Sequence, residues 1–362
     1  MKVKIWMDRI RHKHSFRLYL RSQRIYRFIR KRHINDLYGH FIGKPTGSPQ
    51  YVILRYDSRV GIMCALRYYV FNYMYFSKQN IIPILDIQPR FGIQDNLVEK
   101  GKDSIWDHCF EQVITAEEAY KQESVYVTPV CPAVFYFDRD CKKINGITGD
   151  FGIHLRMDEG WRNYYKRIKM YCSSWLHFKP IVIEYVRKNF DSKVYKDDRI
   201  LGVLLREEFS QEMYDIMSDE CKRIMDHHPR VPNLSETIEI VKKYMKKWDC
   251  NKIFLATMQS ESVLLFQKEF GDQVFFCDRK RISADLYRVN PSDMSDCEFR
   301  DKHFPINKDI QYTGEIIALS KCDCFIGAVS GGAIGAMILN GGMYDEVMIL
   351  GEDNPDGDYC KL

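Results

Sequence analysis

Short apolar runs and longer amphipathic stretches alternate along most of the chain. Tyr51–Tyr56 and Ile81–Ile87 are apolar runs of strand length, and the apolar segment Ile62–Phe76 between them is long enough for a helix. A loop that contains Gly61 joins the first run to this helix. Strand, glycine-bearing loop, helix and strand make a βαβ unit, which predicts a parallel sheet.

The second half of the chain repeats this alternation. Strands are predicted at Ile200–Leu205, Lys252–Ala256, Val274–Cys277, Cys324–Ala328 and Val347–Leu350. Helices are predicted between them at Leu234–Lys247, Ser260–Phe270, Tyr312–Leu319 and Ser330–Leu339, with Ser260 as an N-cap and Gly271 just past a helix end. This order predicts a doubly wound sheet, in which ligands collect at the carboxyl ends of the strands.

Length and the change of pattern together predict two α/β domains. A chain of 362 residues exceeds one ordinary core. The helical stretch Trp161–Lys188, broken by Pro180, separates the two sets of strands, and another strand is predicted at Val125–Val130. We therefore expect a basic helical segment at 1–41, a Rossmann-like domain at 42–190 and a second Rossmann-like domain at 191–362.

Positive charge is concentrated at the start of the sequence. Residues 1–33 contain 12 Lys/Arg and one acid, Asp8, although the whole chain has a net charge of only +5. Apolar residues recur among these cations at helical spacing, as in helices that lie on anionic lipid. The expected membrane contacts are Arg17, Arg21, Arg24, Arg27 and Arg30. A helix docked on its own domain with a solvated basic face is the alternative. Nucleic-acid binding is a third possibility, but no nucleic-acid-binding module in the sequence supports it.

The rest of the sequence favours the cytoplasm. We find no secretory signal and no apolar run of membrane-spanning length, so we expect a peripheral protein on the inner membrane face. The 12 cysteines are irregularly spaced, and in a reducing compartment they are expected to be free thiols.

Arg206 is the first candidate for chemistry. It follows the predicted strand Ile200–Leu205, so it lies at the carboxyl end where ligands collect. A guanidinium there can hold a diphosphate with two hydrogen bonds and stabilise its charge as a bond to phosphate breaks. Pairing with Glu207 or Glu208 is the structural alternative.

Other strand ends carry further polar candidates. Ser330, Gly331 and Gly332 join a strand to a helix, where backbone N–H groups can approach phosphate. Thr257 can bond a phosphate or cap a helix. Asp278 can accept from the paired N–H donors of guanine or close a turn, and Arg281 follows it as a further donor-binding candidate.

A metal site is not expected. His227 and His228 precede Pro229 without a third ligand at a suitable spacing, and Asp138-Arg139-Asp140 follows a strand and more readily closes a turn. Walker, Gly-x-Ser-x-Gly and His-Glu-x-x-His motifs are absent from the sequence.

In order along the chain, these pieces resemble the superfamily of core α-1,6-fucosyltransferases, nodulation fucosyltransferases and protein O-fucosyltransferases. Gly202–Arg206 is similar to the family's Gly-Val-His-x-Arg, which makes Arg206 the counterpart of its essential arginine. His228-Pro229, Leu255–Thr257, Asp278 and the block from Leu319 to Ser330 are similar to later family motifs. Trp106–Gln112 resembles a Trp-Glu-Tyr-Tyr-Phe-Glu-Gln signature of bacterial members.

The resemblance implies a GT-B fold of two facing Rossmann-like domains, no required metal or cofactor, and a nucleotide-sugar donor, with GDP-fucose the leading candidate. It implies donor contacts from Gly61, Arg206, His228, Pro229, Thr257, Asp278, Arg281 and Ser330–Gly332. The expected acceptor is a hydroxyl of a bacterial surface polysaccharide or lipid-linked glycan, attacked with inversion. Glu208, Glu212 and Glu111 are candidates for the residue that removes its proton.

Departures from the family pattern keep another function class open. Leu204 stands where the family has histidine, Glu207 and Phe209 follow Arg206 in place of the usual residues, and Met258 replaces an acid. A non-catalytic protein that binds a nucleotide-sugar or a glycan within a polysaccharide assembly complex is therefore the alternative to a transferase.

Overall fold

The computed structural model describes residues 40–43, 50–57, 62–77, 80–88, 104–122, 124–129, 160–225, 230–289 and 308–350. The chain divides into two compact units, Met1–Ile153 and His154–Leu362. The basic segment is outside the described residues except at its end, where His40–Gly43 form a strand. The helix expected to continue through residue 41 is therefore wrong at His40 and Phe41.

The first unit is a four-stranded sheet with the order β1-β4-β2-β3. Its elements are β1 (His40–Gly43), β2 (Tyr51–Asp57), α3 (Ile62–Ser77), β3 (Ile82–Gln88), α4 (Ile105–Cys109), α5 (Ala116–Tyr120) and β4 (Ser124–Pro129). Strand β2 pairs in parallel with both β3 and β4, and β1 pairs antiparallel with β4. The predicted βαβ unit is confirmed.

The segment from Trp106 to Gln112 supports the edge strand β3. The Gln112 side chain accepts a hydrogen bond from the backbone N–H of Leu85 at 2.7 Å and donates to Asp107 Oδ1 at 2.7 Å. Trp106 is buried and stacks on Phe110 with 3.8 Å between ring centroids. In the described structure this signature therefore satisfies backbone groups that an edge strand leaves unpaired.

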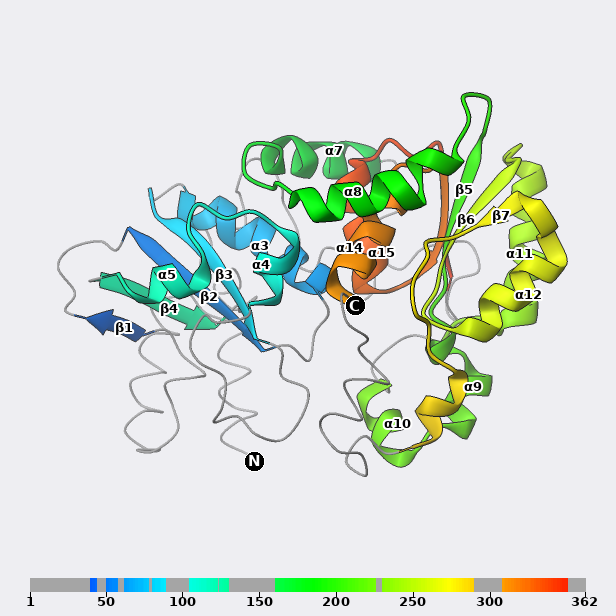
Figure 1. Cartoon of the computed structure of the whole chain (residues 1–362), viewed down its shortest axis with the longest axis horizontal. Coiled ribbons are helices and arrows are strands. Elements are labelled where there is room, and N and C mark those ends of the chain that lie inside the picture. Colours follow the sequence, from blue (N-terminus) through cyan, green and yellow to red (C-terminus); the bar gives the residue numbers. More distant parts are fainter. Residues whose placement is uncertain are drawn as a thin grey trace. The chain divides into compact units, whose positions relative to one another are not determined.

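The second unit is a five-stranded, all-parallel sheet with the order β7-β6-β5-β8-β9 (Figure 1). The strands are β5 (Ile200–Leu204), β6 (Lys252–Ala256), β7 (Val274–Phe275), β8 (Cys324–Ala328) and β9 (Glu346–Leu350). The longer helices are α7 (Trp161–Cys172), α8 (Pro180–Asn189), α11 (Leu234–Lys247), α12 (Ser260–Phe270), α14 (Lys308–Leu319) and α15 (Gly331–Asn340). The predicted doubly wound alternation is confirmed.

Short helical segments connect these elements. They are η2 (Asp191–Lys193), η3 (Glu207–Phe209), α9 (Gln211–Ile216), α10 (Asp219–Met225), η4 (Gly271–Gln273) and η5 (Ala284–Arg288). Strand β7 ends two residues before the predicted Cys277. The N-cap of α12 is Gln259, one residue before the predicted Ser260, and Gly271 ends this helix with a φ of 55°, a conformation that favours glycine.

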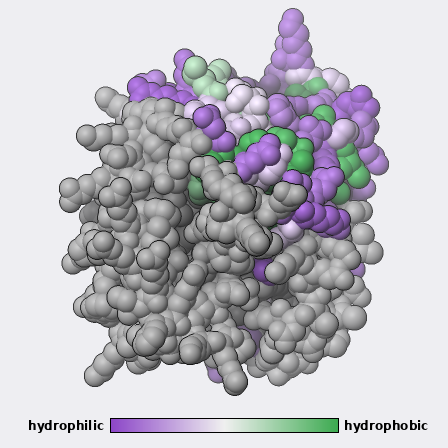
Figure 2. Space-filling view, turned by 90° about the vertical axis from the view of Figure 1, so that its left-hand side faces the viewer, coloured by the Kyte–Doolittle hydropathy of each residue, from purple (hydrophilic) through white to green (hydrophobic). Residues whose placement is uncertain are grey.

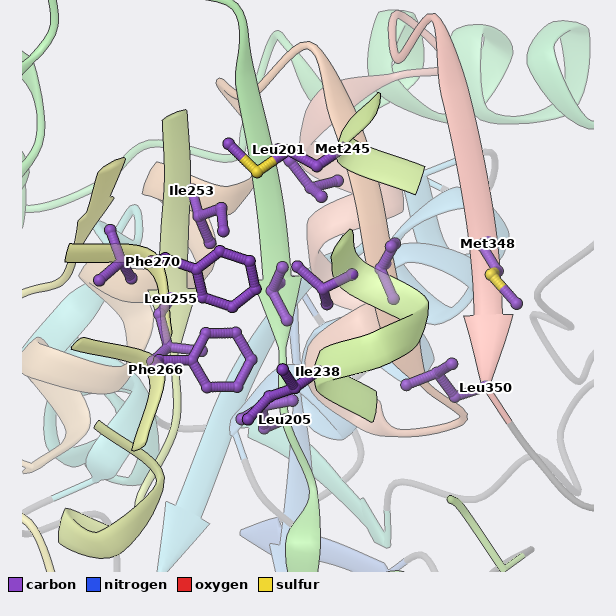
Figure 3. Close-up of a cluster of buried hydrophobic side chains, with 14 of the residues drawn as sticks. Leu201, Leu205, Ile238, Met245, Ile253, Leu255, Phe266, Phe270, Met348 and Leu350 are labelled. Atoms are coloured by element: carbon purple, nitrogen blue, oxygen red, sulfur yellow. The ribbon is translucent and has the colours of Figure 1, made fainter. Parts of the chain in front are cut away.

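Alternate residues of the buried strands face opposite layers. Leu201, Val203 and Leu205 point into the core that α11 and α12 cover (Figure 3). Gly202 faces the other layer, where an added Cβ would lie 3.1 Å from side-chain atoms of Leu319 and Cys322. Fully buried strands of this kind read as unbroken apolar runs, which is why the sequence pattern located them.

Helices α7 and α8 belong to the second unit. They pack on α15 and α14 respectively, so the described chain divides before them and not at the predicted boundary of 190/191. They are amphipathic, with buried residues such as Tyr165 and Val186 and exposed Met170 and Ile181. The described surface in Figure 2 is mainly hydrophilic, with a smaller apolar area among polar side chains.

The described part of the chain contains no helix that is both long and apolar enough to cross a bilayer. Its eight described cysteines are free thiols, and seven of them are buried.

Candidate functional site

The order of the second sheet creates a topological switch point. Chain connections run from β5 in one direction to β6 and β7, and in the other direction to β8 and β9. Strands β5 and β8 are neighbours, with Leu204 paired to Gly327, so the segments that follow them begin side by side. In open parallel sheets the crevice at this point binds ligands. Arg206 and Ser330 lie in these two segments.

Arg206 forms an ion pair with Glu208 through its Nε atom. Its guanidinium also lies over the Phe209 ring, 4.3 Å from the centroid. The side chain remains 25% exposed, whereas that of Glu208 is 5% exposed. Burial works to lower the pKa of Arg206, but the Glu208 carboxylate raises it above its ordinary value, so the guanidinium stays charged. The pairing of Arg206 with Glu208, which the sequence left open as the structural alternative, is therefore present.

Glu207 is a buried carboxyl that the sequence did not single out for chemistry. Burial, followed by the nearby Glu208 charge, raises its pKa to about 7. The Thr257 hydroxyl donates to Glu207 Oε1 at 2.6 Å and accepts from the backbone N–H of Gln259 at 3.0 Å. Thr257 thus links the ends of β5 and β6, and the bond that its hydroxyl accepts from Gln259 is a local one of the kind that closes a turn.

The N-terminus of α15 is built as predicted. Ser330 is its N-cap and its hydroxyl accepts from the backbone N–H of Ala333 at 3.3 Å. Gly332 lies in a tightly packed position, because an added Cβ would lie 2.8 Å from the Tyr312 hydroxyl and 3.1 Å from Leu204. The positive end of this helix dipole therefore lies beside the end of β5.

Cations gather around this part of the sheet. Lys308 is the first residue of α14, and burial lowers its pKa to about 7. The Asp309 charge opposes this lowering, whereas the charges of Arg279 and Arg206 add to it. Arg279 itself is buried in an ion pair of 2.5 Å with Glu315. Much of this positive charge is balanced, because Arg206 pairs with Glu208 and Arg279 with Glu315.

Arg281 serves the loop that follows β7. Its guanidinium donates to the carbonyls of Cys277 at 3.0 Å and Arg279 at 3.3 Å, and it lies 3.8 Å from Glu315. Burial lowers the pKa of Arg281, although Glu315 opposes that effect. Within the described residues Arg281 is thus occupied with its own loop. Asp278 lies on the same loop and is exposed.

The other expected residues are spread over the chain. Glu212 is exposed in the first turn of α9, and Glu111 is exposed in the first unit between α4 and α5. Glu208, the third base candidate, is committed to Arg206. Gly61, His228, Pro229 and the arginines Arg17, Arg21, Arg24, Arg27 and Arg30 lie outside the described residues.

No group of three His, Cys, Asp or Glu side chains in the described ranges is arranged to hold a metal ion. A cavity of about 10 Å³ lies between Arg206, Glu207 and the start of α11. That volume accommodates about one water molecule.

Comparison with known proteins adds a likeness of fold. No family model matches the sequence, and no curated protein matches it. NodZ α-1,6-fucosyltransferase soaked with GDP-fucose matches in structure with a TM-score of 0.46 and 12% identity, over 85% of this chain and 97% of that one. NodZ from Bradyrhizobium matches with a TM-score of 0.45 and 13% identity, over 86% of this chain and 97% of that one.

A third similar structure is POFUT1 in complex with GDP-fucose. It matches with a TM-score of 0.43 and 10% identity, over 85% of this chain and 99% of that one. With TM-scores below 0.5 and identities of 10% to 13%, these likenesses carry no argument about this chain, whose chemistry rests on its own residues.

Proposed function

We propose that this protein is a glycosyltransferase of the fucosyltransferase type that uses a nucleotide-sugar, with GDP-fucose as the leading candidate. One observation carries the proposal. Arg206 follows β5 at the switch point of a five-stranded parallel sheet, beside the capped N-terminus of α15. This is where a diphosphate binds in such folds, and the sequence around Arg206 resembles the family motif that contains an essential arginine.

The chemistry follows from these positions. As the bond between sugar and phosphate breaks, negative charge develops on the departing diphosphate. Arg206, Lys308 and the N–H groups at the start of α15 would stabilise that charge. Asp278 would accept hydrogen bonds from a guanine base. Glu212 and Glu111 remain candidates to remove the proton of the attacking hydroxyl, because Glu208 neutralises Arg206.

The proposed acceptor is a hydroxyl of a bacterial surface polysaccharide or lipid-linked glycan, and the proposed outcome is inversion. The basic segment supports a location on the inner membrane face, because 12 cations within residues 1–33 would attract anionic lipid. Such a location would bring a cytoplasmic enzyme to lipid-linked acceptors.

A non-catalytic binder of nucleotide-sugars is the second candidate. The observation that favours it is the ion pair between Arg206 and Glu208, which offsets the positive charge that a transferase would use. The departures Leu204 and Met258 point the same way.

The experiment compares substitutions of two arginines that flank β5, Arg206 after the strand and Arg199 before it. Arg206→Lys keeps the positive charge but loses the planar fork that matches a diphosphate. We expect it to lower the turnover of GDP-fucose, measured as transfer or donor hydrolysis, by about 100-fold. Arg199→Lys is the matched control, since Arg199 precedes the same strand and bonds the Trp248 carbonyl at 2.9 Å and Asp345 at 2.7 Å. It should change stability and leave turnover intact.

The outcomes separate the candidates. Loss of turnover in Arg206→Lys alone supports the transferase. A wild-type protein that binds GDP-fucose in thermal-shift measurements but never cleaves it supports the non-catalytic binder. A protein stabilised only by uridine or cytidine nucleotides would exclude GDP-fucose as the donor.

A further inference from the structure

The loop from Phe276 to Arg281 has no helix or strand, yet its backbone is firmly held. The backbone N–H of Asp278 donates to Asn189 Oδ1 at 2.8 Å, and the Asp278 carbonyl accepts from the Tyr185 hydroxyl at 3.2 Å. Both polar groups of one peptide residue are thus bonded to side chains of a single helix, α8. That helix lies about 90 residues earlier in the chain.

Further contacts hold the residues on either side. Lys193 Nζ donates to the Phe276 carbonyl at 2.9 Å, and Arg281 bonds the Cys277 carbonyl at 3.0 Å. Arg279 is anchored by its buried ion pair with Glu315 of α14. The loop is therefore held from α8 and α14 together.

The packing of α8 on α14 makes the Tyr185 contact possible. An added Cβ at Gly314 would lie 2.4 Å from Cδ1 of Tyr185, so glycine at this position admits the ring. Burial raises the pKa of Tyr185, which keeps its hydroxyl protonated and able to donate. Asn189 is itself buried and donates to the Tyr185 carbonyl at 3.0 Å, which fixes its orientation.

Against this rigid backbone, Asp278 is exposed. A carboxylate whose backbone is fixed on both sides needs little further ordering when it meets a ligand. This arrangement therefore suits an aspartate that recognises a ligand better than one whose carboxylate only closes its own turn.

We propose that Tyr185 and Asn189 are positioning residues that aim Asp278 at a base with two adjacent N–H donors, so that they set selectivity for guanine. The inference rests on the proposed nucleotide-sugar function and goes beyond it, because it assigns base selectivity to a helix that precedes the nucleotide-binding sheet. Guanine offers a ring N–H and an exocyclic amine to one carboxylate, whereas hypoxanthine offers only the ring N–H.

The test measures binding of GDP, IDP and inorganic pyrophosphate to the full-length protein by calorimetry. Wild type should prefer GDP over IDP by roughly tenfold. Tyr185→Phe and Asn189→Ala should each reduce that ratio by about threefold to tenfold and leave pyrophosphate binding unchanged.

Tyr344→Phe is the matched control. It removes a buried tyrosine hydroxyl that donates to a backbone carbonyl, that of Leu319, at 2.8 Å in the same unit. It should leave the ratio of GDP to IDP affinity at the wild-type value. A loss of both GDP and pyrophosphate binding in Tyr185→Phe would indicate general disruption of the unit and overturn the positioning role.

Two other results are decisive. If wild type prefers GDP and Asp278→Asn abolishes the preference, but Tyr185→Phe and Asn189→Ala keep it, the inference is wrong and the proposed function stands. If wild type binds neither GDP nor pyrophosphate, the proposed function fails and the inference fails with it.

Discussion

Lys308 should make the proposed nucleotide binding sensitive to pH. Its pKa of about 7 reflects first its burial and then, after the opposing effect of Asp309, the charges of Arg279 and Arg206. A bound diphosphate would raise this pKa by adding negative charge nearby. At pH 7.5 the free protein would hold the lysine mostly neutral and the complex would hold it mostly charged. GDP binding should therefore take up a fraction of a proton and weaken as the pH rises above 7.

Calorimetry of GDP binding in buffers with different ionisation enthalpies measures this uptake directly. Lys308→Met should abolish it, whereas Lys321→Met, at an exposed lysine paired with Asp191, should not. Equal heats in all buffers for wild type would mean that Lys308 does not sense the ligand.

Glu207 couples folding to pH through its burial. Burial and then Glu208 raise its pKa from 4.5 to about 7, so the folded chain holds more protons than the unfolded chain between these values. The stability that the protonated carboxyl contributes is complete below pH 4.5 and is lost as the pH rises through 7. Glu207→Gln keeps an acceptor for Thr257 and removes the titration. The free energy of unfolding of the variant should therefore rise relative to that of wild type as the pH rises, by up to about 3 kcal/mol.

Urea unfolding from pH 4.5 to 8 measures this difference. Glu269→Gln is the control of opposite sign, because the hydrogen bond and charge of Lys242 lower the pKa of Glu269. Because the titration of Glu269 lies at and below pH 4.5, the difference in stability between that variant and wild type should stay nearly constant above about pH 5.5. A constant gap between Glu207→Gln and wild type would show that Glu207 titrates alike in both states.

Among the elements, the packing of α8 on α14 depends on Gly314 of α14. An added Cβ at Gly314 would lie 2.4 Å from the Tyr185 ring, so Gly314→Ala should cost about 1–3 kcal/mol of stability. The cost should fall sharply in a Tyr185→Ala background, where the methyl group has room. A double-mutant cycle from denaturant unfolding measures this coupling. Additive effects of the two substitutions would show that the ring does not fill the space above Gly314.

The elements also show what the sequence could predict. Strands β5 and β8 are buried at every position, so their apolar runs identified them. Strand β7 was predicted two residues too long, because Phe276 and Cys277 continue the apolar run but leave the ladder to form the loop. Helix caps shifted by one residue because side-chain pattern alone does not show where the backbone bonds begin.

The residues of the candidate site likewise fall into those that the sequence pattern could locate and those that it could not. Arg206 and Ser330 could be located because each ends a recognisable strand. The ion pair of Arg279 with Glu315 and the bonds from α8 to Asp278 could not, because they join residues far apart in the sequence and leave no periodic signal. The burial of Glu207 was missed for a similar reason, since it depends on neighbours such as Thr257.

For the whole molecule, charge is divided unevenly along the chain. Residues 1–33 carry 12 cations and one anion, so with a total of +5 the remainder has a net charge of 5 − 11 = −6. A protein of this kind should bind an anionic bilayer through its first segment while the rest is repelled. Anionic lipid attracts each basic residue by about 1 kcal/mol at the surface, and the attraction is screened by salt.

Replacing Arg17, Arg21, Arg24, Arg27 and Arg30 together by glutamine tests this division. Cosedimentation with vesicles that contain phosphatidylserine should fall by more than tenfold, since about five favourable contacts are lost. Binding to GDP should not change, because the nucleotide residues proposed for the second unit remain. Wild type should bind purely zwitterionic vesicles weakly, and added salt should release it from anionic ones. Equal binding of wild type and variant to anionic vesicles would mean that the basic segment packs on protein, and the membrane location would then have no support in its charge.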